Sequence, residues 1–199
     1  IQASLAFRGK QTGKFHYASA LFYATDLEKQ LQQAFPSLLS SLTGALRRKM
    51  EVVDRVDVLI GTEQVHTVFQ WLDQQPMLQK EDKLSGPFAW RGQFVEQALK
   101  LVVLFCRLQD FYQQLILQTG SKEHLELPVG EGKQLGEVLD SIMEPLSEAA
   151  VYEQAGLPYI PPELREGQIE LAWAREKGSP RLLEMQDLRG VFHSHTTYS

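Results

Sequence analysis

The eight-residue run Leu99–Cys106 is the feature that most limits how this 199-residue chain can fold. Every residue in it except Lys100 is apolar, and it contains no glycine or proline. A strand that reads as a nearly continuous apolar run is usually covered on both faces. We therefore expect this strand at the centre of a sheet that has helices packed against it.

The rest of residues 20–121 alternates between helical and strand patterns, which predicts an α+β fold. Helical spacing of apolar residues predicts helices over 20–35, 65–72 and 110–118, the first of them ended by Pro36. Strand patterns cover 38–43, 53–61 and 88–92. Residues 76–87 are polar and contain turn signals, so they predict a loop.

Beyond residue 121 the pattern becomes mainly helical. Residues 128–132 are typical of a linker, and helical patterns follow over 135–146, 147–155 and 168–176. Three prolines within residues 157–166 predict an extended, exposed path.

Composition indicates an ordinary globular protein, with 43% hydrophobic and 23% charged residues. There is no apolar run long enough for a membrane span and no signal segment, so we predict a cytoplasmic location. The single cysteine, Cys106, excludes a disulfide framework and is expected to be a small buried hydrophobe. The chain begins at Ile1 rather than methionine, which suggests a piece of a longer protein.

Charge is divided unevenly along the chain. Residues 1–125 carry 14 Lys and Arg against 12 Asp and Glu, a net charge of +2. Residues 126–199 carry 6 against 13, a net charge of −7. Because DNA is bound largely through neutralisation of its phosphates, the second part should repel it, and we expect weak DNA binding by this chain alone.

The stretch 43–60 carries the clearest chemical signal. Gly44-Ala45 lets backbone N–H groups approach a phosphate, and the guanidinium of Arg48 can donate two hydrogen bonds to phosphate oxygens. Acids at positions i and i+2 of the following strand would face one way and share metal ions, with a third acid on a neighbouring strand completing a two-metal site. The chain keeps Asp57 there, so the stretch indicates a nucleotidyl-transfer site that has lost most of its carboxylates.

Several segments together resemble the bacterial branch of DNA polymerase family X, relatives of polymerase beta that carry an added polymerase-and-histidinol-phosphatase (PHP) domain. The most specific are Leu-Pro-Tyr-Ile-Pro-Pro-Glu-Leu-Arg-Glu and the later His-Ser-His-Thr-Thr-Tyr-Ser. The segments lie at 44–48, 56–60, 111–124, 157–166 and 187–199, in that order.

The resemblance implies a nucleotidyltransferase palm with a mixed sheet and flanking helices, followed by a mainly helical thumb. It places an N-terminal segment at 1–15, the palm at 16–121, the thumb at 122–186 and the start of a PHP domain at 187–199. It also implies a DNA repair or synthesis lineage, DNA as partner, Mg²⁺ as cofactor and an intramolecular contact with the PHP domain.

When the metal-binding residues of the family are matched one by one to this chain, most of the carboxylates are missing. The first metal-binding aspartate of the family matches Arg55, the second matches Asp57 and the third matches Val102. Asp54 could replace the first carboxylate only through a bulge, because residues three apart face opposite ways on a regular strand. Asp57 is open to a second interpretation, as a structural ion pair with Arg55 or Arg48.

The nucleotide contacts are also reduced. The family's Gly-Ser that holds the triphosphate is Gly44-Ala45 here, while Arg48 matches the phosphate-binding arginine. Gly120 and Ser121 match a Thr-Gly-Ser turn beside the nucleotide. The neighbouring sugar and base contacts are replaced by Leu117, Gln118 and Leu125.

The site residues that match the family can also be explained by a purely structural role. The Thr-Gly-Ser turn can be only a helix C-terminal turn. Arg47 and Arg48 can be solvated residues at a helix start, and Trp90 can be a packing residue.

His193 and His195 lie two apart, so both rings can reach one metal ion. In the PHP domains that this segment resembles, such a pair supplies the first ligands of a multi-metal phosphoesterase site. Two ligands do not complete a site, so metal binding here is expected only with a whole PHP domain.

The sequence therefore predicts a degenerate polymerase core, with no productive Mg²⁺ binding, that positions DNA or a PHP domain. A competing prediction is a weak nucleotidyltransferase that uses Arg48, Asp57 and the Thr-Gly-Ser turn. A third is a protein-interaction module that uses the acidic thumb.

Overall fold

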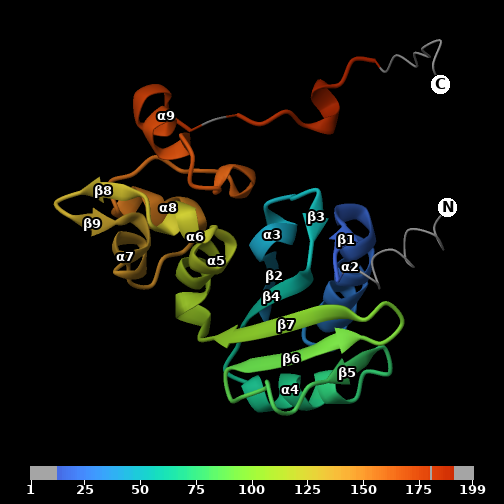
Figure 1. Ribbon diagram of the computed structural model, residues 1–199. Helices are drawn as coiled ribbons and strands as arrows, with labels where there is room; N and C mark the ends of the chain where they lie inside the picture. Colours follow the sequence, from blue (N-terminus) through green and yellow to red (C-terminus); the bar gives the residue numbers. More distant parts are fainter. Residues whose placement is uncertain (1–12, 180, 191–199) are drawn as a thin grey trace, which may run out of the picture.

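The computed structural model describes residues 13–179 and 181–190. Its main element is a five-stranded mixed sheet, which Figure 1 shows with helices around it. Strand β4 pairs in parallel with β7, and the other neighbours are antiparallel. The strands, in spatial order, are β2 (Leu39–Thr43), β4 (Arg55–Gly61), β7 (Leu99–Cys106), β6 (Ala89–Phe94) and β5 (Leu78–Lys80). The predicted α+β class and the mixed sheet are confirmed, whereas β5 lies where the sequence predicted a loop.

Strand β7 is central, as its composition predicted, but only one of its faces is fully covered. Leu99, Leu101 and Val103 are buried, while Val102 and Leu104 on the other face are partly exposed and line a pocket. The expectation of two covered faces was wrong. Apolar residues on a strand can either be covered by a helix or form the floor of a pocket, and the sequence pattern is the same in both cases.

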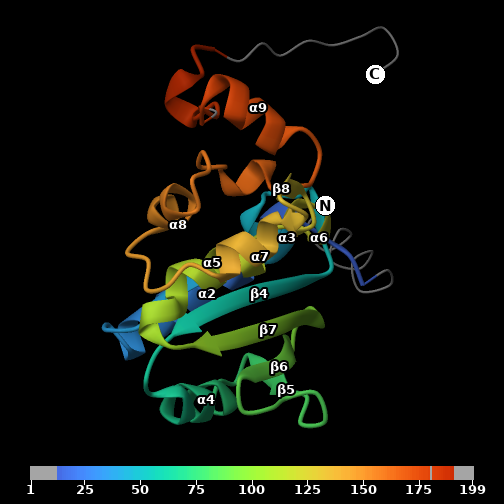
Figure 2. The ribbon, with the colours of Figure 1, turned by 90° about the vertical axis from the view of Figure 1, so that its left-hand side faces the viewer.

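The larger core lies on the opposite face of the sheet, under helices α2 (Tyr17–Ala34) and α4 (Val65–Asp73). Trp90 is completely buried there, and its Nε1 donates to Asp73 Oδ1 at 2.8 Å, so its interpretation as a packing residue holds. Figure 2 shows α4 below the sheet and α5 (Phe111–Thr119) above β4 and β7. Helix α5 begins after the 3-10 turn Leu108–Asp110 and packs through Phe111 and Leu115 on the pocket face. Cys106 lies beside this contact, half-buried, and burial raises its pKa to about 12.

Residues 116–174 build a second core, whose buried members include Ile116, Tyr152 and Ile160. The predicted linker at 128–132 is instead a hairpin, since Gly130 and Gly132 adopt positive φ angles that permit a tight turn. The elements of this part are α6 (Lys122–Leu125), β8 (Pro128–Gly130), β9 (Lys133–Gln134), α7 (Leu135–Asp140), α8 (Glu148–Gln154), the 3-10 turn Pro162–Leu164 and α9 (Glu170–Lys177).

The proline-rich segment 157–166 is packed rather than exposed, which corrects the sequence prediction. Ile160 and Arg165 are completely buried, and no residue of the segment is fully exposed. Gly167 follows at φ +78°, where an added Cβ would collide with the backbone and side chain of Glu123. The prolines fix the path of the backbone, but the apolar and charged side chains between them hold it against the rest of the fold.

Short elements complete the description. Strands β1 (Phe15–His16) and β3 (Val52–Val53) form a small antiparallel pair, and helix α3 (Gly44–Arg47) follows β2. A 3-10 turn, Met185–Asp187, lies near the end of the described residues. None of the helices within 13–179 and 181–190 combines the length and apolar character needed to cross a membrane.

Candidate nucleotide pocket

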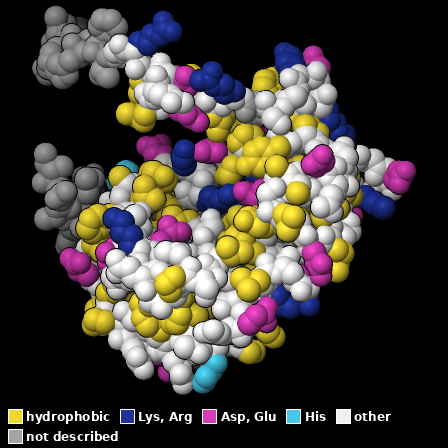
Figure 3. All heavy atoms as spheres, turned by 180° about the vertical axis from the view of Figure 1, so that it is seen from behind, with side chains coloured by type: hydrophobic (Ala, Val, Ile, Leu, Met, Phe, Trp, Pro, Cys, Tyr) yellow, Lys and Arg dark blue, Asp and Glu magenta, His cyan; other side chains and the backbone are white. Residues whose placement is uncertain are grey.

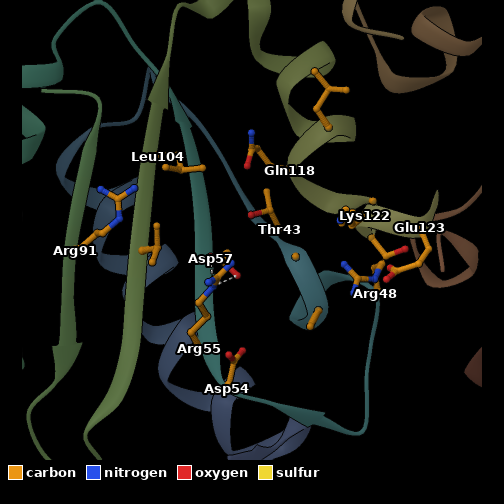
Figure 4. A pocket seen from close by; sticks show the side chains of 16 residues that line it. Thr43, Arg48, Asp54, Arg55, Asp57, Arg91, Leu104, Gln118, Lys122 and Glu123 are labelled. Atoms are coloured by element: carbon orange, nitrogen blue, oxygen red, sulfur yellow. Dashed lines mark hydrogen bonds and ion pairs between the residues drawn. The ribbon is translucent and has the colours of Figure 1, made fainter. Parts of the chain in front are cut away.

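A pocket of about 560 Å³ lies over the face of β4 and β7 that faces α3, α5 and α6 (Figure 4). It brings together every predicted nucleotide-site residue and both replaced carboxylate positions: Gly44, Ala45, Arg48, Arg55, Asp57, Val102, Gly120 and Ser121. His193 and His195 lie outside the described residues. Stretches more than 70 residues apart in the sequence therefore meet in one site.

Asp57 is held by the arginine two residues before it. Arg55 Nε donates to Asp57 Oδ1 at 2.8 Å and to Oδ2 at 3.0 Å. Burial raises the pKa of Asp57 above its ordinary value, and the hydrogen bond and charge of Arg55 offset part of that rise. Both side chains point to one face of β4, so the two-residue spacing places a cation beside the carboxylate where the resemblance requires an anion.

The strand register lays out the pocket floor as one row across four strands. Thr43 pairs with Asp57, Asp57 with Val102, and Val102 with Arg91. Residues directly opposite on neighbouring strands share a face of the sheet. The floor thus carries a hydroxyl, a carboxylate, an apolar side chain and a guanidinium, in that order.

Asp54 lies in the bend between β3 and β4 rather than within a regular strand, and it lines the same pocket as Asp57 (Figure 4). Residues three apart face opposite ways only on a regular strand, and the break at Asp54 supplies the irregularity that the prediction left open. The negative charge of Asp54 also contributes to the raised pKa of Asp57. Even so, no group of three or more His, Cys, Asp or Glu side chains suited to a metal ion occurs in the described part of the chain.

The three basic residues 47–49 each pair with a glutamate from residues 148–166. The pairs are Arg47–Glu148 at 2.5 Å, Arg48–Glu166 at 2.6 Å and Lys49–Glu163 at 2.8 Å. The side chains of both arginines are less than one fifth exposed. Their interpretation as solvated helix-start residues is therefore wrong, because they join the sheet region to the helical region.

The hydrogen-bond donors of Arg48 are used in contacts within the protein. Its Nε donates to Glu166, and its Nη1 donates to the carbonyl oxygen of Thr119 at 2.8 Å. Its forked guanidinium, which the sequence assigned to phosphate, faces a carboxylate and a carbonyl instead. The sequence contained Glu166 within the most specific motif but gave no sign that its partner would be Arg48.

Glu148 is a residue that sequence reasoning missed. It accepts hydrogen bonds from Arg47 and from Arg165, whose side chain is completely buried and faces the rings of Tyr152 and Tyr159. Burial raises the pKa of Glu148, but the two arginines outweigh burial and bring it below the ordinary value. No local pattern around position 148 indicated this role, because both partners are distant in the sequence.

The Thr-Gly-Ser turn has a structural role and also borders the pocket. Helix α5 ends at Thr119, Gly120 follows as its C-cap, and Ser121 caps α6 by accepting from the backbone N–H of His124 at 3.0 Å. Gly120 and Ser121 line the pocket. The interpretation as a helix-ending turn thus describes the local structure without removing these residues from the site.

His124 is completely buried behind this turn, next to a carboxylate and a tyrosine hydroxyl. Its Nδ1 lies 2.7 Å from Glu170 Oε1, and its Nε2 lies 3.4 Å from the hydroxyl of Tyr152. Burial lowers the pKa of His124 below its ordinary 6.5, although the hydrogen bond and charge of Glu170 act against this. The folded protein therefore favours the neutral ring, with Nδ1–H donating to the carboxylate.

Because the folded-state pKa of His124 lies below the unfolded value, the unfolded chain binds the extra proton as pH falls through about 6.5. We expect the free energy of unfolding to decrease from pH 7.5 to 5.5, by at most about 1.4 kcal/mol per pH unit for one proton. Urea unfolding at several pH values measures this. His124→Gln should flatten the dependence, and an equally steep dependence in that variant would contradict the assignment.

Comparisons with known proteins give one curated relative and a shared fold. No protein-family model matches the chain. Over 214 residues it is 28% identical to a curated protein of Bacillus subtilis (strain 168), "DNA polymerase/3'-5' exonuclease PolX", in an alignment that takes in 100% of this chain and 36% of that protein. The chain thus spans about a third of that relative's length.

Two crystal structures of Leishmania infantum polymerase beta show a similar fold. Its ternary P/T complex matches with a TM-score of 0.59 and 17% identity, covering 77% of this chain and 77% of that one. Its ternary gap complex matches with a TM-score of 0.59 and 16% identity, covering 76% and 70%. At these identities the likeness concerns the fold alone, which is that of polymerase beta.

Proposed function

The chain is family X DNA polymerase-like, and we propose that it serves as a non-catalytic core that positions DNA or a neighbouring domain. The observation that carries this proposal is the contact of Arg55 Nε with both carboxylate oxygens of Asp57. A two-metal transfer site needs several carboxylates to offset two divalent cations. Arg55 and Asp57 together carry no net charge.

The pocket residues do not fit the Mg²⁺ that the family implies. Val102 offers no oxygen ligand, Arg55 repels a cation, and Asp57 is already hydrogen-bonded. Asp54 adds one carboxylate, but Mg²⁺ requires a near-octahedral set of oxygen ligands. The pocket lining therefore does not support a metal-dependent catalytic step.

The proposed arrangement is a palm at 16–121 and a thumb at 122–186, with a PHP domain beginning at 187. Ion pairs of residues 47–49 with glutamates 148, 163 and 166 support a fixed relation between palm and thumb. A positioning core needs such rigidity. DNA is the proposed partner because the chain resembles DNA polymerases. Binding is expected to be weak, because residues 126–199 carry a net charge of −7.

A weakly active nucleotidyltransferase is the second candidate, favoured by the open pocket that Gly44, Gly120 and Ser121 still line. An interaction module built on the acidic thumb is less favoured. Three of its glutamates are already paired with residues 47–49, so they are not free to attract a basic partner.

Primer extension separates the first two candidates. We expect the purified protein, given primer-template, dNTPs and either Mg²⁺ or Mn²⁺, to add no nucleotides, because the metals lack ligands. The Bacillus subtilis relative, assayed identically, serves as the positive control. Templated extension that Asp57→Asn abolishes would overturn the proposal in favour of the transferase.

A further inference from the structure

Cationic and anionic side chains line the pocket in nearly equal numbers. The chain carries a formal net charge of −5, and acidic and basic side chains are scattered over the face seen in Figure 3. The cations of the pocket lining are Arg48, Arg55, Arg91 and Lys122, and its anions are Asp54, Asp57 and Glu123. Two of the four cations that line the pocket are paired with glutamates outside the lining, Arg48 with Glu166 and Lys122 with Glu126. An anionic ligand is therefore favoured by the cations that keep unused hydrogen-bond donors, and not by a net charge of the pocket.

Two of these guanidiniums have unused donors. Both contacts of Arg55 with Asp57 are made by Nε, so its two Nη groups have no hydrogen-bond partner among the described residues. The guanidinium of Arg91 donates only from Nη1, to the carbonyl oxygen of Leu84 at 2.7 Å, and it forms no ion pair within the part of the chain that the structure describes. An arginine without a carboxylate partner, in a pocket, is suited to a ligand that brings the negative charge.

The Thr43 hydroxyl is a third unused group. Thr43 is 1% exposed, lines the pocket and pairs in register with Asp57, yet its Oγ1 has no hydrogen-bond partner within residues 13–179 and 181–190. A buried hydroxyl without a partner costs about 1–3 kcal/mol. A ligand oxygen at the floor would satisfy it.

From these three observations we propose that the pocket binds a phosphate group without a divalent metal, using Arg55, Arg91 and the Thr43 hydroxyl. This rests on the proposed non-catalytic function, since a working metal site would need Asp57 free of Arg55. The proposed phosphate position is at the sheet floor and not at Arg48, because Arg48 is paired with Glu166. The phosphate can be that of a free polyphosphate or the 5′-phosphate at a nucleic-acid end.

Calorimetric titration with inorganic triphosphate tests the proposal. We expect binding in EDTA, weakened by added Mg²⁺ because the metal withdraws the anion into a complex. Arg91→Gln should weaken binding of triphosphate by about tenfold or more. Arg91→Lys should have an affinity between those of the parent protein and Arg91→Gln, because lysine keeps the charge but cannot donate two parallel hydrogen bonds. The matched control is Arg107→Gln, an arginine outside the pocket that pairs with Asp110, and it should leave affinity unchanged.

The outcomes are decisive in each direction. Binding that requires Mg²⁺, no binding in EDTA, or equal effects of Arg91→Gln and Arg107→Gln in folded protein would overturn the proposal. A 5′-phosphorylated oligonucleotide that outcompetes its unphosphorylated form identifies a strand end as the source, whereas displacement by free triphosphate alone identifies a small ligand. Primer extension reports separately on the proposed function, so a failure of either can be recognised.

Discussion

Glu148→Gln is expected to lower the free energy of unfolding by about 3–5 kcal/mol, the usual cost of breaking a buried ion pair from one side. The substitution keeps the shape of the side chain but removes the charge that Arg47 and Arg165 share. Arg165 is 0% exposed, and its Nη2 already lacks a partner among the described residues. Its charge would then be buried without compensation.

Urea unfolding of the variant at neutral pH measures this change. The matched control is Glu163→Gln, which breaks a pair with Lys49, a side chain that is 62% exposed. Exposed pairs contribute about 0–1 kcal/mol, so the control should remain close to the parent protein. Losses of similar size in the two variants would show that the burial of Arg165 does not set the energy.

The pocket residues come from separate stretches at 43–48, 54–57, 91, 102–104 and 117–123, and the family resemblance rather than strand periodicity indicated that most of these stretches would meet. The apolar run Leu99–Cys106 predicted a central strand, but its parallel pairing with β4 and the register Asp57 to Val102 come from the structure. The same-face rule for positions two apart correctly set Arg55 beside Asp57. That is a local effect, which sequence patterns contain.

The partners of the basic residues were not predictable from patterns. Arg47 meets Glu148 across 101 positions, and Arg48 meets Glu166 across 118. Such contacts depend on how the helical region packs on the sheet region, and periodicity carries no information about that. The same applies to the proline-rich segment, where composition suggested exposure but tertiary packing buried Ile160 and Arg165.

Replacing Arg55 and Val102 together by aspartate is expected to make the stability of the protein depend on divalent metal. Position 55 shares a face with Asp57, and position 102 is its register neighbour on β7. Three carboxylates would then converge on the pocket floor. Without metal they repel one another, so the double variant should be less stable than the parent protein in EDTA.

Thermal unfolding during a Mn²⁺ titration measures the response. Metal at ten times its dissociation constant stabilises a one-site protein by about 1.4 kcal/mol, so the midpoint of the double variant should rise with Mn²⁺. The parent protein should not respond, because Arg55 occupies Asp57. The control, Arg55→Asn with Val102→Asn, has the same shape without the charge. Equal responses of the aspartate and asparagine variants would mean that the metal acts elsewhere, and that the missing carboxylates are not what separates this pocket from a metal site.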